Sequence, residues 1–196
     1  MNGDKGVKGL LLITTGYLIW GLLPLYWKFL SHVGSIEILL HRVFWTALIC
    51  IIYMMVMKKN PFTFIKQTLS QHSIILMLLS ALFLSINWLS YIYAVTTNHL
   101  LQASMGYFIS PLLIVLFGLL LFKEKMSKLQ VIALVVCALA VGYATVGVGE
   151  IPYLSIAIGF SFSLYTMCKK LIKLGGIQSL LMDTVLLLPA VVITMI

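Results

Sequence analysis

Seven long apolar segments follow one another along the chain, and they constrain its fold more than any other feature. They cover residues 9–27, 36–57, 74–95, 101–122, 129–147, 152–168 and 178–196. Each has about 17–22 residues, enough for a helix to cross the ~30 Å hydrocarbon core of a bilayer. Continuous runs such as "PLLIVLFGLLLF" lack the alternation of a membrane β-barrel strand. The sequence therefore predicts an all-α integral membrane protein with about seven transmembrane helices.

The composition agrees with a lipid environment. Hydrophobic residues make up 62% of the chain and charged residues only 9%, whereas a soluble domain is roughly half apolar and a quarter charged. The net charge of +8 is compatible with nucleic-acid binding, but the basic residues form short clusters between apolar segments. We therefore expect the lipid bilayer, and not nucleic acid, to surround this chain. Its three cysteines lie far apart without metal-like spacing, so we expect no metal and no cofactor.

The basic residues predict the orientation. Eleven of the thirteen fall in the N-terminal segment and in the second, fourth and sixth connections. If every segment crosses, these regions share one side, and the connections "TTNH" and "GVGEIP" on the other side contain no Lys or Arg. The positive-inside rule then places the N-terminus in the cytoplasm. The two exceptions are Lys28, which we interpret as an interfacial anchor, and Arg42.

An acid, an imidazole and a guanidinium occur within six positions of the second segment, in "EILLHR". Arg42 lies roughly 10 Å below the outer end of a helix that starts near Gly34. Glu37 and His41 share a face at spacing i, i+4, while Arg42 is rotated away from them. Charged groups inside a membrane are usually paired or face water. We therefore predict that Arg42 and Glu37 line a cavity and that Glu37 and His41 are candidates for proton coupling; snorkelling of Arg42 to the interface is the alternative.

Polar and aromatic residues on other segments predict further cavity-lining positions. In the third segment a helical stripe includes Ser80, Asn87 and Tyr91, and it faces either a neighbouring helix or a wet cavity. Trp88 points away from this stripe and is expected to be a packing residue or part of the interfacial aromatic belt. With Trp20 and Tyr107 added, the predicted substrate-binding residues are Trp20, Glu37, Arg42, Asn87, Tyr91 and Tyr107.

Three residues are predicted to shape moving helices. Pro111 removes a backbone hydrogen bond within the fourth segment, and Pro24 does the same within the first. Gly106, four residues before Ser110, allows close approach of another helix. We interpret Pro24, Gly106 and Pro111 as candidate kink or gating positions.

Enzyme signatures such as H-E-x-x-H, G-x-S-x-G and the P-loop do not occur in the sequence. We therefore expect no enzymatic activity. Two alternatives to a transporter stay open: an intramembrane enzyme that uses Glu37 and His41 as an acid–base pair, and a truncated remnant that does not transport.

Several motifs together resemble the RarD subfamily of EamA-domain transporters in the drug/metabolite transporter superfamily. They are "WGLLPLYWKFL", "EILLHRVFW", "INWLSYIYAV", "QASMGYFISPLLIVLFGLLLFKEK" and "LQVIAL". The resemblance implies a bacterial inner-membrane permease for a small metabolite or drug-like solute. It also implies alternating access and two inverted five-helix repeats.

The chain is shorter than this resemblance implies. Residues 1–147 would form the first five-helix repeat and residues 148–196 two helices of the second, so we expect a truncated form. A weak similarity of the sixth and seventh segments to the first and second, with Tyr165 matching Tyr17 and Asp183 matching Glu37, agrees with an inverted repeat.

Overall fold

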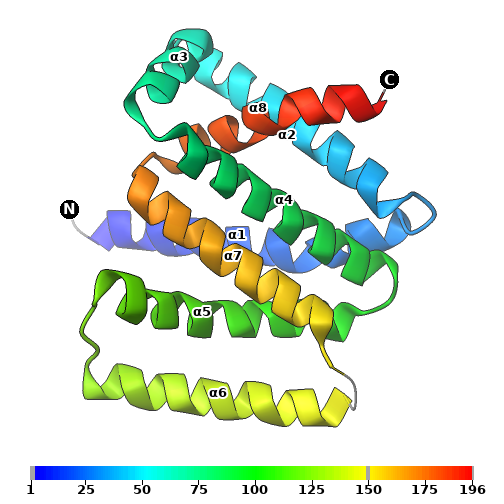
Figure 1. Cartoon of the computed structure of the whole chain (residues 1–196), viewed down its shortest axis with the longest axis vertical. Coiled ribbons are helices and arrows are strands. Elements are labelled where there is room, and N and C mark those ends of the chain that lie inside the picture. The colour runs from blue at the N-terminus through cyan, green and yellow to red at the C-terminus, as the bar shows by residue number, and fades with distance from the viewer. Residues whose placement is uncertain (1–2, 149–150, 196) are drawn as a thin grey trace.

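The computed structural model describes residues 3–148 and 151–195, and within these ranges it contains helices and no strand (Figure 1). The helices are α1 (Gly3–Phe29), α2 (Ser35–Val56), α3 (Pro61–Gln71), α4 (Ile74–Thr96), α5 (Leu100–Phe122), α6 (Lys128–Val148), α7 (Tyr153–Ile172) and α8 (Gly176–Met195). The seven long ones correspond to the seven apolar segments, so the predicted all-α membrane fold is confirmed.

Six of the described helices are long and apolar enough to cross a membrane: α1, α2, α4, α5, α6 and α8. The sixth expected span, α7, has 20 residues but is less apolar because it carries several serines. Ser155, Ser161 and Ser163 are buried and donate hydrogen bonds to backbone carbonyls. These hydroxyls are satisfied inside the bundle, so α7 can lie at membrane depth despite its lower hydropathy.

The short helix α3 was not expected from the apolar segments. The Asn60 side chain caps it by accepting hydrogen bonds from the backbone N–H groups of Phe62 and Thr63 at 3.0 and 3.1 Å, and Pro61 occupies its first turn. With 11 residues it is too short to span a bilayer. It packs Phe64 and Ile65 against the ends of α2 and α8.

The long helices alternate in direction. In Figure 1 the N-terminal end, α3 with the connections on both sides of it, and the α5–α6 and α7–α8 connections lie on the left. The α1–α2, α4–α5 and α6–α7 connections lie on the right. The left side is therefore the one that carries the clustered lysines. The chain thus separates its lysine-rich connections from "TTNH" and "GVGEIP", which contain no Lys or Arg, as the sequence predicted.

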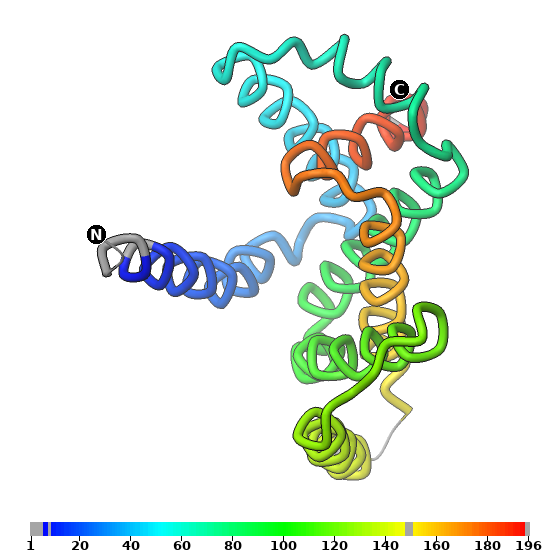
Figure 2. The backbone as a smooth tube through the Cα atoms, turned by 90° about the vertical axis from the view of Figure 1, so that its left-hand side faces the viewer, coloured from blue at the N-terminus to red at the C-terminus, as the bar shows by residue number. Residues whose placement is uncertain are grey.

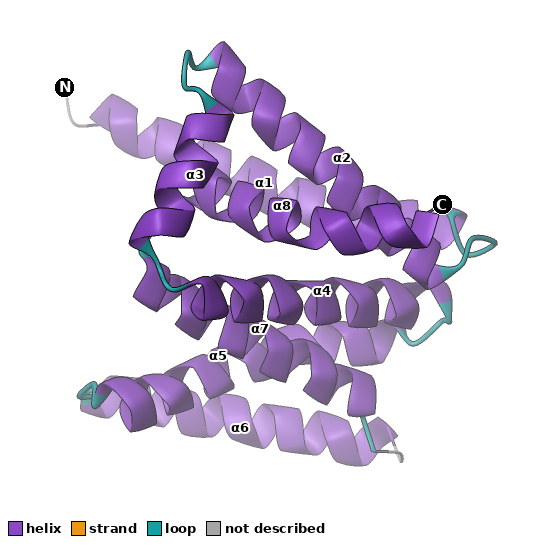
Figure 3. Ribbon diagram, turned by 45° about the horizontal axis from the view of Figure 1, so that its top comes forward, coloured by secondary structure: helices purple, strands orange, loops and turns teal. Residues whose placement is uncertain are grey.

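The centre of the molecule is α7, which packs against α4 and α5, while α8 packs against α2 and α4. Figure 3 shows α8 lying between α2 and α4, with α6 at the outer edge beside α5. Figure 2 shows α1 projecting away from the other helices, and its main contact is with α4. Of the elements that carry the predicted site residues, α4 and α5 therefore pack against α7, and α1 and α2 join them through α4.

Two glycines allow α5 and α7 to approach closely. A Cβ atom added at Gly106 would lie 2.7 Å from the Ile158 side chain and 3.2 Å from the Ser155 carbonyl oxygen. A Cβ added at Gly159 would lie 2.7 Å from Ile109. The absence of a side chain at both positions sets the distance between the two helices.

Hydrogen bonds supplement this contact. The Ser155 Oγ donates to the Gln102 carbonyl oxygen at 2.7 Å, and the Leu154 N–H donates to Gln102 Oε1 at 3.3 Å. About two turns further along α7, the Ser163 Oγ donates to the Ser110 carbonyl oxygen at 3.1 Å. The contact is therefore fixed along its length and not only at the glycines.

Three of the four non-glycine residues with positive φ in the described chain are lysines at the ends of helices. Lys58 (φ 56°), Lys123 (φ 51°) and Lys173 (φ 57°) follow or cap α2, α5 and α7. The fourth is Asn98 (φ 64°) after α4. Such left-handed positions after helices are usually glycine.

The α5–α7 contact predicts different effects of one substitution at two glycines. Gly106→Ala should lower the free energy of unfolding by about 1–3 kcal/mol, because the new methyl group overpacks against Ile158. Gly142→Ala on α6, where no atom lies within 4 Å of the added Cβ, should be neutral or stabilising because alanine favours helix. Thermal unfolding in detergent measures both, and equal effects would contradict the prediction.

Candidate functional site

A small enclosed cavity of about 60 Å³ lies where α1, α2, α4, α5 and α7 meet. Its walls combine aromatic rings with an amide and a guanidinium: Trp20, Leu23, Trp27, Arg42, Asn87, Trp88, Tyr91, Tyr107 and Phe162. The structure thus brings together five of the six predicted substrate-binding residues, all except Glu37. A polar cavity among apolar helices is the kind of place where a solute or ordered water binds.

The guanidinium of Arg42 is held by aromatic rings. Its Cζ atom lies 3.9 Å from the ring centroid of Trp88 and 5.4 Å from that of Trp27. In the described part of the chain Arg42 forms no ion pair. Cation–π contacts of this kind are worth about 2 kcal/mol when water is excluded, which offsets much of the ~2.5–3.5 kcal/mol cost of a charge in a membrane helix. Its N–H donors are therefore not committed to a carboxylate of the described residues.

Tyrosine rings form the opposite wall of the cavity. The ring of Tyr107 lies between that of Trp20, at a centroid distance of 5.0 Å, and that of Tyr91, at 5.6 Å, both in edge-to-face geometry. Tyr91 is buried, Tyr107 is half-buried and Trp20 is exposed on α1. These contacts link α1, α4 and α5 through a row of rings.

Asn87 joins the cavity to α7. Its Nδ2 donates to the Ile158 carbonyl oxygen at 3.0 Å and lies 3.4 Å from the Ser161 Oγ. The side chain is buried on the predicted polar stripe of α4. Asn87 therefore lines the cavity and also holds α4 to α7, so both interpretations of the stripe apply to this residue.

Glu37 and His41 lie outside the cavity, in an open groove of about 550 Å³ between α1 and α2. Both side chains are exposed. A residue five positions before Arg42 is rotated about 140° from it around the helix, which explains why Glu37 does not reach the cavity. Arg42 and Trp27 line both the groove and the cavity, so they form the boundary between the two.

The predicted kink residues lie within continuous helices. Neither α1 at Pro24 nor α5 at Pro111 is interrupted. Next to Pro111, the Ser110 Oγ donates to the Gly106 carbonyl oxygen at 2.9 Å. Gly106 itself is packed against α7, so its observed contact is structural, and gating by these three residues stays a prediction.

Sequence reasoning missed three aromatic residues of the site: Trp27, Trp88 and Phe162. Trp27 follows Trp20 by seven residues, a spacing that places both on one helix face. Its buried Nε1 has no hydrogen-bond partner among the described residues. Trp88 was expected to be a packing residue, but it contacts Arg42. Among the described residues, no group of three His, Cys, Asp or Glu could hold a metal ion.

A membrane bundle with a polar cavity at its centre defines a class of proteins that move or bind solutes within a bilayer, and sequence comparison identifies the family. Residues 7–146 match the EamA-like transporter family. Because this match covers more than half of the chain, the protein belongs to the EamA-like transporter family.

Curated relatives agree with this assignment. The chain is 35% identical over 191 residues to the uncharacterized transporter YojE of Bacillus subtilis, covering 96% of this chain and 64% of YojE. It is 31% identical over 194 residues to protein RarD of Escherichia coli, covering 98% and 65%. For protein RarD of Streptomyces exfoliatus the identity is 35% over 184 residues, covering 93% and 58%. The predicted RarD-type resemblance is therefore confirmed.

The chain spans 58–65% of the length of these three relatives. No solved structure matches it. Family membership and the six candidate spans support a multi-pass membrane transporter.

The contact between Arg42 and Trp88 predicts an energetic coupling. A double-mutant cycle of Arg42→Met and Trp88→Leu should give a coupling of about 1–2 kcal/mol, because the ring partly replaces the water around the cation. Unfolding of the four proteins in mixed micelles measures it. The matched control is a second cycle that combines Arg42→Met with Tyr93→Leu, because Tyr93 has an exposed ring on the same helix. A coupling near zero in both cycles would contradict the prediction.

Proposed function

We propose that this protein is a permease that moves a small metabolite or drug-like solute across the bacterial inner membrane by alternating access. One observation carries the proposal: an arginine that has no ion pair among the described residues, an amide and tyrosine rings converge on a cavity inside an apolar bundle. Polar groups converge at membrane depth where a polar solute crosses.

Arg42 gives the site its selectivity in this proposal. Its N–H groups can donate charge-assisted hydrogen bonds to an acidic or strongly polar group of the solute. The tyrosine and tryptophan rings supply flat apolar surface for the rest of it. This combination suits a small amphipathic solute better than a simple ion or a lipid.

In this proposal the boundary between the groove and the cavity moves during transport. The cavity of about 60 Å³ is below the ~300–1,000 Å³ of typical ligand pockets, whereas the groove of about 550 Å³ falls within that range. We propose that the solute enters from the groove and that Trp27 and Arg42 move to admit it. Glu37 and His41 in the groove are then candidates for proton coupling near the entrance.

In this proposal an inverted repeat makes alternating access possible. The α7–α8 hairpin begins on the opposite side of the molecule from the α1–α2 hairpin, so the two run in opposite directions (Figure 1). This supports residues 1–147 as a first repeat and residues 148–196 as part of a second. In such folds the two repeats rock against each other around a central site.

Transport measured in vesicles tests this proposal. Protein reconstituted into lipid vesicles should accumulate or release at least one solute from a panel of labelled amino acids, organic acids and aromatic drugs. Arg42→Ala should lower the initial rate about tenfold or more, because it removes charge-assisted hydrogen bonds worth ~1.5–3 kcal/mol.

Lys28→Ala provides the matched control, because Lys28 is an exposed cation at the end of α1 outside the cavity. It should leave the rate within about twofold, since an exposed charge contributes little. Equal losses in the two variants would exclude a specific role for Arg42, and no transported solute in the panel would contradict the permease proposal.

Orientation in the membrane gives a second test. With the N-terminus in the cytoplasm, a cysteine introduced at exposed Asn98 should react with an impermeant thiol reagent added to whole cells. A cysteine introduced at exposed Lys125 should react only after the cells are opened. The reverse pattern would contradict the proposed orientation.

A further inference from the structure

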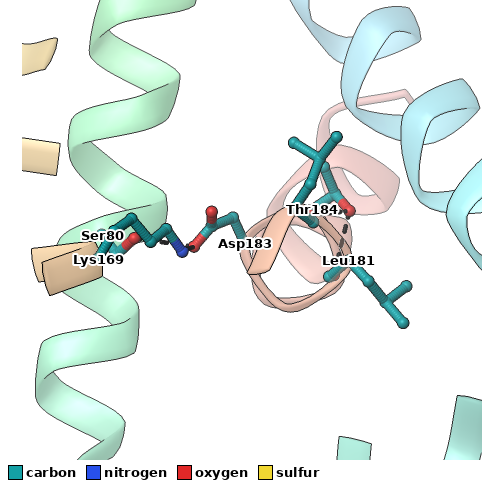
Figure 4. Close-up of polar contacts among 6 residues, drawn as sticks. Ser80, Lys169, Leu181, Asp183 and Thr184 are labelled. Carbon is teal, nitrogen blue, oxygen red and sulfur yellow. Dashed lines mark hydrogen bonds and ion pairs between the residues drawn. The ribbon is translucent and has the colours of Figure 1, made fainter. Parts of the chain in front are cut away.

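A second buried charged group joins α4, α7 and α8, outside the cavity described above. The Lys169 Nζ lies 2.6 Å from Asp183 Oδ1, and the Ser80 Oγ donates to the same oxygen at 2.9 Å (Figure 4). Asp183 is 1% exposed. We call these three residues the inner triad, because they lie toward the lysine-rich side of the molecule. One carboxylate oxygen thus holds together three helices.

The other carboxylate oxygen is not used. Asp183 Oδ2 is buried and has no hydrogen-bond partner among the described residues. A buried carboxylate oxygen without a donor costs free energy as long as the group is charged. A proton bound at Oδ2 removes that charge and leaves Oδ1 free to keep its hydrogen bond from Ser80.

Lys169 and Asp183 differ in their access to water. Lys169 lies in the last turn of α7 and its side chain is 18% exposed, so it can extend to water beyond the end of the helix. Asp183 lies seven residues into α8, roughly 10 Å from its start. Loss of charge on Asp183 therefore releases Lys169 to solvent and leaves no unpaired charge inside.

Few other titratable groups face the triad. From α7, the hydroxyl of Tyr165 faces Asp183 and its ring lies 5.1 Å from the Lys169 Nζ, while Cys168 is buried beside Lys169. From α4 the facing group is the Ser80 hydroxyl. On the opposite side of α8, Leu181 and Thr184 point away from Asp183 (Figure 4), and Leu181 packs against Cys50 of α2. Lys169 is thus the charged partner of Asp183 among these groups.

The position of Asp183 in α8 is similar to the position of Arg42 in α2. Arg42 lies seven residues into α2, and Asp183 lies seven residues into α8, which enters from the opposite side and packs against α2. The bundle therefore carries a buried cation near one face and a buried anion at a similar depth from the other. In alternating-access proteins one half of the fold gates against the other around a central site, so a charged group on each side of the bundle is placed where such gating can act.

We propose that Asp183 is a proton-binding site and that the inner triad is a gate, closed while the Lys169–Asp183 pair is intact. This inference rests on the proposed transport function. A proton from water on the lysine-rich side binds Asp183 Oδ2 and forms an O–H bond, which neutralises the carboxylate. Lys169 keeps its charge and moves to solvent. The C-terminal end of α7 and the N-terminal end of α8 then separate from α4.

Cys168 serves as a native reporter of this opening. It is buried next to Lys169, in an apolar cluster with Met77 and Met182. A protein that keeps only this cysteine, through Cys50→Ser and Cys137→Ser, is incorporated into lipid nanodiscs and labelled with a water-soluble maleimide. A second protein that lacks the three native cysteines and carries one introduced at Lys125, which is exposed in the α5–α6 connection on the lysine-rich side, corrects for the pH dependence of the thiol reaction.

The corrected rate of Cys168 labelling should rise about tenfold or more as the pH is lowered, because protonation shifts the triad toward its open state. Asp183→Asn, a neutral isostere, should label fast at every pH. Asp183→Glu should retain the pH dependence. Glu124→Gln provides the matched control, because Glu124 pairs with Lys170 at the exposed surface nearby, and it should leave Cys168 protected.

Infrared spectroscopy reads the proton directly if Asp183→Asn does not fold. The fully native protein should show a protonated carboxyl C=O band that appears over the pH range in which Cys168 becomes reactive. A band that is absent, or Cys168 that stays protected at low pH, would overturn the proposal and leave the pair as a structural ion pair. Neither measurement needs a transported solute, so a failed transport panel and a failed gate are separate results.

Discussion

The contact between α5 and α7 is the interaction on which the rest of the bundle depends. Lipid tails are as apolar as leucine, so helices in a membrane associate through close packing and hydrogen bonds instead of the hydrophobic effect. Gly106 and Gly159 remove the side chains that would separate these two helices, and the hydroxyls of α7 bind carbonyls of α5. With α7 fixed in this way, α4 packs against it and α8 packs against α4, so Asn87, Tyr91 and Asp183 acquire their positions.

Most of the fold could be predicted because the bilayer dictates it. The length of each apolar run fixed the seven long helices to within a few residues, and the lysines fixed which connections share a side. The short helix α3 was missed, since the signal sought was a 20-residue apolar run, although Asn60 followed by Pro61 is a helix start. The satisfied serines of α7 show why hydropathy alone undervalues a helix that is surrounded by other helices.

The candidate site could be predicted only in part. Helical spacing placed Arg42 on another face of α2 than Glu37 and His41, but it could not show that of Arg42 and Glu37 only Arg42 reaches the cavity, because that depends on how α2 is rotated in the bundle. Trp88 was assigned to packing because its Cβ points away from the polar stripe. A tryptophan side chain is long enough to reach Arg42 from the edge of that face, and a helical wheel records only the direction of the Cβ.

The lysines after α2, α5 and α7 have a consequence for the engineering of this protein. A left-handed backbone conformation costs a non-glycine residue on the order of 1 kcal/mol, so glycine at Lys58, Lys123 and Lys173 would form easier turns. Each replacement would also remove a cation that complements a helix C-terminus and that biases how the nascent chain threads into the bilayer. Variants selected for heat resistance by glycine substitution at these turns would therefore risk inserting upside down.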